Sequence, residues 1–115
     1  MKKKLLLADH DHEYMKELSY YFMEQVPQFE LVLFTKEETL LQYLQGEEPR
    51  DVLVLDEQFV NDEIKSRSSG VTRVVLMTNQ IPLEGFSGVK KYQKLSDLVS
   101  QVLMHYAEEH QLLNK

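Results

Sequence analysis

The sequence predicts an α/β fold built on a five-stranded parallel sheet. Short apolar runs rich in Val and Leu alternate along the chain with segments of helical periodicity. Several of the apolar runs end in a polar residue, most clearly Asp51–Asp56, where four apolar residues lead straight into a carboxylate. Strands that alternate with helices imply right-handed crossovers and a sheet covered on both faces. At 115 residues the chain is expected to form one domain over residues 1–115.

The first two strands are expected at residues 4–8 and 29–34, because both runs are apolar and the second is rich in β-forming residues. Between them, residues 13–25 carry apolar side chains at helical spacing, and Pro27 marks the end of that helix. A second helix is predicted after Thr35 and Glu38, which have the spacing of a capping box. Gly46 is its expected C-terminal cap.

The third strand, residues 51–55, is expected to lie at the centre of the sheet, since it is apolar throughout. A weaker helix is predicted over residues 58–65, with an inner face of Phe59, Val60 and Ile64, followed by a flexible loop at 66–70. The fourth strand is expected at residues 71–77.

A short fifth strand is predicted at residues 89–92, and Ser96 is expected to cap a last helix that buries Leu98, Val99, Val102 and Tyr106. The step from Thr78 to Lys91 is short for a helix of about 11 residues together with its turns. A fourth helix between the last two strands is therefore expected to be missing or reduced.

The common topology for five such strands is the flavodoxin-like order 2-1-3-4-5, in which strands one and three are neighbours. This order places Asp9 and Asp56 close together at one edge of the sheet, with Thr78 beside them. Two carboxylates that lie close together repel each other unless a proton or a cation lies between them. The site is therefore expected either to bind a hard cation such as Mg²⁺ or to raise a carboxyl pKa.

Composition excludes several classes of function. The formal net charge of −6 argues against nucleic acid as an electrostatically attracted partner. The absence of cysteine excludes disulfides, thiolate catalysis and sulfur-ligated zinc. The basic N-terminus leads into only four apolar residues before Asp9, so it is expected to form a strand of a cytoplasmic protein, without membrane insertion. The sequence contains no glycine-rich phosphate-binding loop, so it does not predict a nucleotide cofactor.

Four strand-end motifs together resemble the receiver domain of bacterial response regulators. They are Leu5–Asp11, Asp51–Asp56, Val74–Thr78 and Val89–Tyr92, and they occur in the order and spacing of that family over nearly the whole chain. The resemblance implies that Asp56 is the acceptor of a phosphoryl group from a histidine kinase and that Asp9 binds the metal. It also implies that Thr78 is the switch hydroxyl and that Lys91 pairs with the phosphoryl group.

The sequence departs from the receiver pattern at several of these positions. His10 stands where receivers place a second acid, so Asp11 would have to reach back to complete a metal site formed by Asp9, Asp56 and Asp11. Tyr92 replaces the proline that follows the lysine, and Gly88 replaces the switch aromatic residue. A magnesium site that lacks one carboxylate loses charge that the ion needs, so we expect weak Mg²⁺ binding and slow or absent phosphotransfer.

The opening of the last segment, Lys91-Tyr92-Gln93, is similar to the degenerate receiver-like domain at the N-terminus of TadZ/CpaE-type pilus-assembly ATPases related to MinD. That resemblance implies a domain for localisation and protein contacts, with the ATPase in a following domain of a longer protein. An interaction module of this kind is expected to dock protein partners or a second copy of the chain in a homodimer.

Three functions remain open on the sequence. The preferred one is a degenerate receiver-like interaction module that is not an enzyme. The second is a phosphoaccepting receiver that uses Asp56. The third is a phosphatase of the haloacid-dehalogenase type, because Asp9-His10-Asp11 follows a first strand and Asp9 could act as nucleophile with Asp11 as the acid. Simpler interpretations also stand: Asp9 and Asp56 could each cap a helix, and Lys91 could be a solvated lysine.

Overall fold

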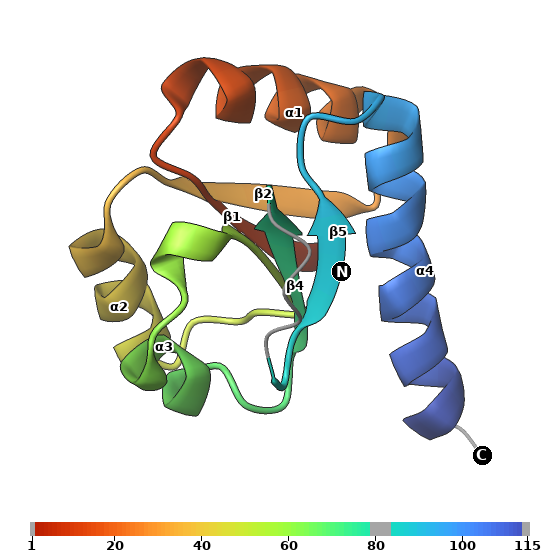
Figure 1. Ribbon diagram of the computed structural model, residues 1–115. Helices are drawn as coiled ribbons and strands as arrows, with labels where there is room; N and C mark the ends of the chain where they lie inside the picture. The colour runs from red at the N-terminus through yellow and green to blue at the C-terminus, as the bar shows by residue number, and fades with distance from the viewer. Residues whose placement is uncertain (1, 79–83, 114–115) are drawn as a thin grey trace.

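The computed structural model describes residues 2–78 and 84–113, with side chains described as far as residue 109. It contains one parallel sheet of five strands in the order β2-β1-β3-β4-β5, which confirms the predicted topology. Figure 1 shows α1 and α4 on one side of this sheet and α2 and α3 on the other. The strands are β1 (Lys3–Ala8), β2 (Phe29–Phe34), β3 (Val52–Asp56), β4 (Thr72–Met77) and β5 (Ser87–Lys90).

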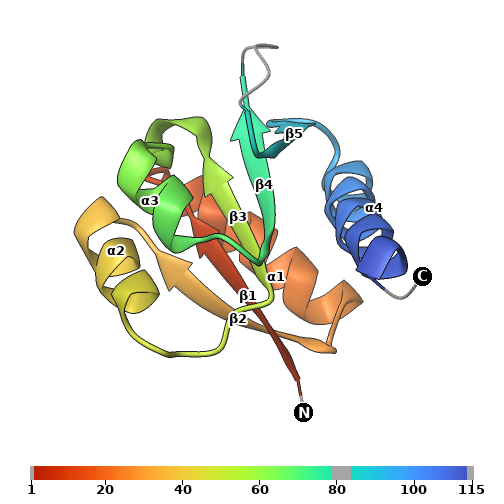
Figure 2. The same cartoon turned by 90° about the horizontal axis from the view of Figure 1, so that it is seen from below.

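The central strand β3 organises the core because all five of its residues are buried. Its side chains alternate between the two faces of the sheet, as the pleat requires. Val52 and Val54 pack with α1 (His12–Gln25) and α4 (Leu95–Leu113). Leu53 and Leu55 pack on the opposite face, which is covered by α2 (Glu37–Gln45) and α3 (Asp62–Arg67). Figure 2 shows these layers from below.

The second helix does not begin with the predicted capping box. Its N-cap residue is Lys36, whose side chain makes no capping hydrogen bond, and the backbone carbonyl of Thr35 instead contacts the His10 ring. The helix therefore begins at Glu37, which places two glutamates in its first turn, where negative charge is favourable.

The helix predicted over residues 58–65 is divided into two short helices. A 3₁₀ turn, η1 (Glu57–Phe59), follows β3 directly, and α3 begins only after the Asn61 side chain accepts a hydrogen bond from the Ile64 amide. The predicted flexible loop at 66–70 also begins later than expected, since α3 extends to Arg67. Ser68 is buried and donates to the Ile64 carbonyl. Phe59 and Ile64 point inward as predicted, and Val60 is half-buried.

The end of the fold differs from the prediction by about two residues in each element. The fifth strand covers Ser87–Lys90 and stops there because Tyr92 has a positive φ of 66°, which an extended strand cannot contain. The last helix begins at Leu95, so Ser96 lies inside its first turn and is not its cap. Leu98, Val99 and Val102 are buried as expected, and Tyr106 is partly buried against the same core.

The connection between β4 and β5 forms no helix in its described residues, which are Thr78 and residues 84–86. The prediction that a fourth helix is missing or reduced also concerns residues 79–83, which lie outside the described part of the chain. Gly88 lies close to the neighbouring strand, because a Cβ atom at this position would stand 2.8 Å from the Met77 sulfur. Among residues 2–78 and 84–113, no helix is both long and apolar enough to cross a membrane.

Candidate functional site

The site lies at the carboxyl edge of the sheet, where β1, β3 and β5 end on the same side. Asp9 directly follows β1, Asp56 is the last residue of β3, and the two strands are paired, with Ala8 opposite Leu55. Lys91 directly follows β5, and its backbone amide donates to the Met77 carbonyl at the end of β4. The register of the sheet thus brings together residues that are far apart in the sequence.

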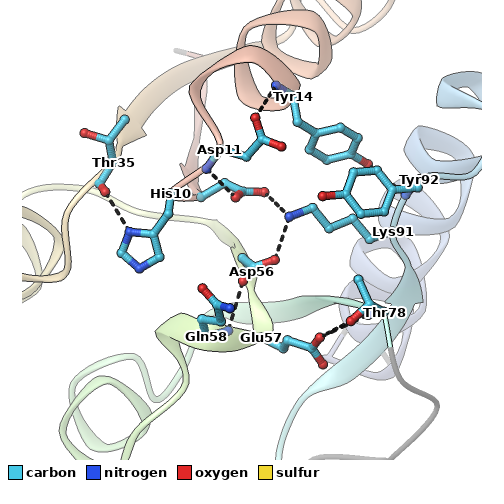
Figure 3. Close-up of polar contacts among 11 residues, drawn as sticks. His10, Asp11, Tyr14, Thr35, Asp56, Glu57, Gln58, Thr78, Lys91 and Tyr92 are labelled. Carbon is cyan, nitrogen blue, oxygen red and sulfur yellow. Dashed lines mark hydrogen bonds and ion pairs between the residues drawn. The ribbon is translucent and has the colours of Figure 1, made fainter.

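Lys91 holds the two aspartates together. Its ammonium nitrogen lies 2.7 Å from Asp56 Oδ1 and 2.8 Å from Asp9 Oδ2. Figure 3 shows the Lys91 side chain directed towards Asp56. The exposed fractions are 2% for Asp9, 6% for Asp56 and 6% for Lys91, so all three residues are buried. The cation expected between the carboxylates is therefore a side chain of the protein itself.

The second oxygen of each aspartate caps a turn. Asp9 Oδ1 accepts a hydrogen bond of 2.9 Å from the Asp11 amide, and Asp56 Oδ2 accepts one of 3.0 Å from the Gln58 amide at the start of η1. The cap and the charged site are thus not alternatives, because each carboxylate uses one oxygen for the turn and the other for Lys91. This double use fixes both carboxylates in orientation.

Burial and ion pairing act in opposite directions on Lys91. Desolvation lowers the pKa of its ammonium, but hydrogen bonds and charge interactions with Asp56 and Asp9 outweigh that effect, so the pKa is raised above its ordinary value. Lys91 therefore remains protonated at neutral pH. Interpreting it as a solvated lysine is wrong, since Lys91 is buried and paired.

Two tyrosines complete the surroundings of the ammonium group. Tyr14 on α1 and Tyr92 each place their ring centre 5.1 Å from Lys91 Nζ, within the range of cation–π attraction. The two rings meet edge to face at 5.0 Å, and the Tyr92 amide donates to the Tyr14 hydroxyl. Burial raises the pKa of the Tyr14 phenol. Sequence reasoning assigned Tyr14 to packing in the core or on the helix surface and treated Tyr92 only as a departure, because no pattern in the chain shows that α1 and the end of β5 meet.

Thr78 is not joined to Asp56 by a hydrogen bond in the described site. Its amide donates to Glu57 Oε1 at 3.2 Å, and its hydroxyl also donates to that oxygen. Glu57, the residue after Asp56, was not predicted as part of the site. The available signal for Glu57 in the sequence was its position immediately after a buried strand. In the structure, η1 turns the Glu57 carboxylate towards the end of β4 (Figure 3).

The side chains of His10 and Asp11 have contacts of their own beside the two buried aspartates. The His10 ring stacks on Phe59 at 4.3 Å and its Nδ1 lies 3.1 Å from the Thr35 carbonyl oxygen. The Asp11 carboxylate accepts a hydrogen bond from the Tyr14 amide and so caps α1. Both residues line the pocket beside Asp9 and Asp56, but the contacts of their side chains are with other residues.

The donor set does not suit Mg²⁺ in this arrangement. Two carboxylates face each other, but a protein ammonium group lies between them, and Mg²⁺ requires oxygen ligands in near-octahedral geometry. Within the described ranges, no group of three or more His, Cys, Asp or Glu residues could hold a metal ion. The predicted set of Asp9, Asp56 and Asp11 is thus not assembled as three ligands.

The site opens to the surface through a shallow pocket of about 200 Å³. Asp9, Asp56, Thr78 and Lys91 all contribute to its lining, together with neighbours from the β1–α1 and β3–η1 turns. The four residues predicted from separate strand ends therefore share one cavity. Chemically, the pocket presents a buried cluster of two carboxylates and one ammonium group, with a formal charge of −1, beneath a partly exposed rim.

The fold is shared with receiver domains of known structure. No protein-family model and no curated protein sequence matches the chain significantly. A receiver domain from Bacillus halodurans is 15% identical, with 91% of this chain and 97% of that one covered and a TM-score of 0.75. A CheY-like receiver domain from Methanospirillum hungatei is 13% identical over 96% and 98%, with a TM-score of 0.78.

A third similar structure is the receiver domain of a Francisella response regulator. It is 17% identical, 94% of this chain and 99% of that chain are covered, and the TM-score is 0.74. At these identities the likeness establishes the fold: a CheY-like, flavodoxin-like domain over nearly the whole chain.

Proposed function

We propose that this chain is a degenerate receiver-like signalling domain that acts by binding other proteins and performs no catalysis of its own. The observation that carries the proposal is the position of Lys91, whose ammonium group occupies the space between Asp9 and Asp56. A phosphoacceptor needs its carboxylate free to attack and a metal to neutralise the incoming charge. Here the carboxylate is already paired.

Two further contacts support a site that is fixed in one state. Thr78, the switch hydroxyl of the family resemblance, already donates to Glu57 within the same chain. Tyr14 and Tyr92 pack beside the Lys91 ammonium, which strengthens its position between the carboxylates. The arrangement holds Asp56 in place without any phosphoryl group, so the signal is expected to depend on which proteins contact the surface.

The sequence similarity at Lys91-Tyr92-Gln93 extends this proposal. We infer that the domain is of the localising type found at the N-terminus of TadZ/CpaE-type pilus-assembly ATPases, and that it acts in the cytoplasm. Its partners are then proteins of that assembly and copies of itself. Affinity capture with the full-length protein as bait should recover such components, and the Leu33→Lys variant tests self-association separately.

A working phosphoacceptor is the second candidate, and one observation favours it. Asp9, Asp56, Thr78 and Lys91 line the same open pocket, so a small phosphoryl donor can approach Asp56 from solvent. In this case a histidine kinase is the partner, and Lys91 would have to release Asp56 and pair with the phosphoryl group. No comparable observation favours a phosphatase that uses Asp9, because its carboxylate faces Lys91 and is 2% exposed.

Intact-mass measurement after incubation with acetyl phosphate and Mg²⁺ separates these functions. The proposed interaction module should show no added phosphoryl mass under conditions that modify an active receiver used as the positive control. An adduct that is absent from Asp56→Asn would overturn the proposal and establish the phosphoacceptor. Release of inorganic phosphate from a phosphomonoester, abolished in Asp9→Asn, would instead establish the phosphatase.

A further inference from the structure

The edge strand β2 has a free side that is unusually apolar. Within the described chain, β2 pairs only with β1, and the order of the sheet leaves its other side open. An unpaired edge is a template for pairing with another strand, and soluble proteins usually protect such edges with Lys, Pro or a bulge. The β2 sequence FELVLF contains neither Lys nor Pro, and its register with β1 is continuous over all six residues.

The hydrogen bonds identify which backbone groups are free. The Lys3 amide donates to the Gln28 carbonyl and the Asp9 amide donates to the Phe34 carbonyl, so even-numbered residues of this segment face β1. Because the backbone alternates with a period of two, the amide and carbonyl groups of Leu31 and Leu33 point to the open side. The free edge is thus formed by two leucines.

Exposed apolar side chains flank this edge. The Leu33 side chain is 45% exposed, and Leu31 is partly buried against the core beneath α1. On α1, Tyr14 touches Tyr92 on the β5 side, and Met23 follows about two and a half turns later, which places Met23 on the opposite flank, towards β2. The Met23 side chain is 50% exposed. Figure 1 shows α1 running beside β2.

The charge pattern of this edge favours a second copy of β2 as the strand that pairs with it. The chain carries a net charge of −6, which disfavours contact between most parts of two copies. The only charged residue of β2 is Glu30, and its carboxylate is paired with Lys4 at 2.9 Å, so the edge itself is close to neutral. An antiparallel strand of the same sequence places leucine opposite leucine, whereas a charged strand from another protein would lack partners for its charges.

We propose that β2 is a homodimer interface, in which the β2 strands of two copies pair antiparallel about a two-fold axis at Val32. In this register Leu31 of one copy lies opposite Leu33 of the other, and each such pair exchanges two backbone hydrogen bonds. Met23 of both copies lies beside the junction on the α1 side. The inference rests on the proposed interaction function and names one partner for it, a second copy of this chain.

Sedimentation equilibrium over a range of concentrations tests the interface with the whole chain. The wild type should dimerise reversibly, and Leu33→Lys, which places a charge on the edge, should weaken dimerisation by about tenfold or more. Met104→Lys is the matched control, since it adds the same charge at a residue of α4 that is 53% exposed, and it should dimerise like the wild type. Circular dichroism verifies that both variants are folded.

Hydrogen exchange provides a readout at the residues themselves. The amides of Leu31 and Leu33 should exchange more slowly as wild-type concentration rises, and this concentration dependence should disappear in Leu33→Lys. A chain that stays monomeric at millimolar concentration overturns the interface, as does a dimer that Leu33→Lys leaves intact. If that happens while Asp56 still takes no phosphoryl group, the surface is wrong but the proposed interaction function stands.

Discussion

At the scale of single residues, the central feature is that one lysine is the ion-pair partner of both Asp9 and Asp56. Each carboxylate is buried, and each has one oxygen on Lys91 and one on a backbone amide. Burial of charge is costly unless the charges are paired and hydrogen-bonded, and here both conditions are met. Removal of any one member should therefore affect the whole cluster.

Lys91→Met should destabilise the fold by about 3–5 kcal/mol at neutral pH, because it leaves two buried carboxylates facing each other without a cation. Urea denaturation followed by circular dichroism measures the loss. Lys90→Met is the matched control, since Lys90 is exposed on β5 and its replacement should change the free energy of unfolding by no more than about 0.5 kcal/mol. Equal losses in the two variants would show that the Lys91 ion pairs contribute little.

The pKa shifts of Lys91 and Tyr14 predict how stability depends on alkaline pH. Both values are raised in the folded protein, Lys91 by its carboxylate partners and Tyr14 by burial. Their stabilising contributions are therefore fully present below their unfolded-state values, about 10.4 for lysine and about 10 for tyrosine, and are lost as pH rises through the raised folded-state values.

Tyrosinate absorbance during a base titration measures the Tyr14 shift directly. The wild type should show a late-ionising tyrosine component, and this component should be absent from Tyr14→Phe. Tyr20→Phe is the control, because Tyr20 is an exposed residue of the same helix and its replacement should leave the late component in place. A late component that survives in Tyr14→Phe would assign the shift to another tyrosine.

At the scale of elements, short turns decide where the site residues point. The alternation of strands and helices was predictable because apolar periodicity is strong in β1, β2, β3, β4 and the two long helices. The division of residues 57–67 into η1 and α3 was not, since it depends on Asp56 and Asn61 both acting as caps within six residues. That division turns Glu57 towards Thr78, so a local capping choice sets the contents of the site.

Substitutions of Asp11 separate its role as a helix cap from a role as a metal ligand. Its carboxylate caps α1 through the Tyr14 amide at 3.1 Å, so Asp11→Ala should cost about 1 kcal/mol of stability. Asp11→Asn should cost only a few tenths of a kcal/mol, because asparagine caps almost as well. Thermal and urea unfolding compare the variants in EDTA. A large loss in Asp11→Asn would show that the negative charge itself is required.

At the scale of the whole molecule, a ligand that binds only the folded state raises its stability by mass action. The wild type should show no increase in its thermal midpoint when Mg²⁺ is added to millimolar concentration, because Lys91 already occupies the space between the carboxylates. Lys91→Met should gain stability with Mg²⁺, since that variant frees both carboxylates as oxygen ligands.

CaCl₂ and NaCl at matched ionic strength are the controls for the Mg²⁺ measurement. They distinguish binding at this site from general screening of the net charge of −6. An increase in the wild-type midpoint that is specific for Mg²⁺ and lost in Asp9→Asn would contradict the prediction. It would also restore the phosphoaccepting function as the better interpretation of Asp56.

The sequence by itself determined the topology and the meeting of Asp9 with Asp56, because parallel strand order follows from alternating apolar periodicities and both residues directly end strands. It also placed Lys91 at the site, but through the family resemblance. Only the tertiary structure decided the partners: Lys91 between two carboxylates, Glu57 on Thr78, and Tyr14 beside Tyr92. These contacts join residues up to 82 positions apart, as Lys91 and Asp9 are (91 − 9 = 82). Side-chain direction and burial at such separations depend on packing between elements, which no local pattern in the chain records.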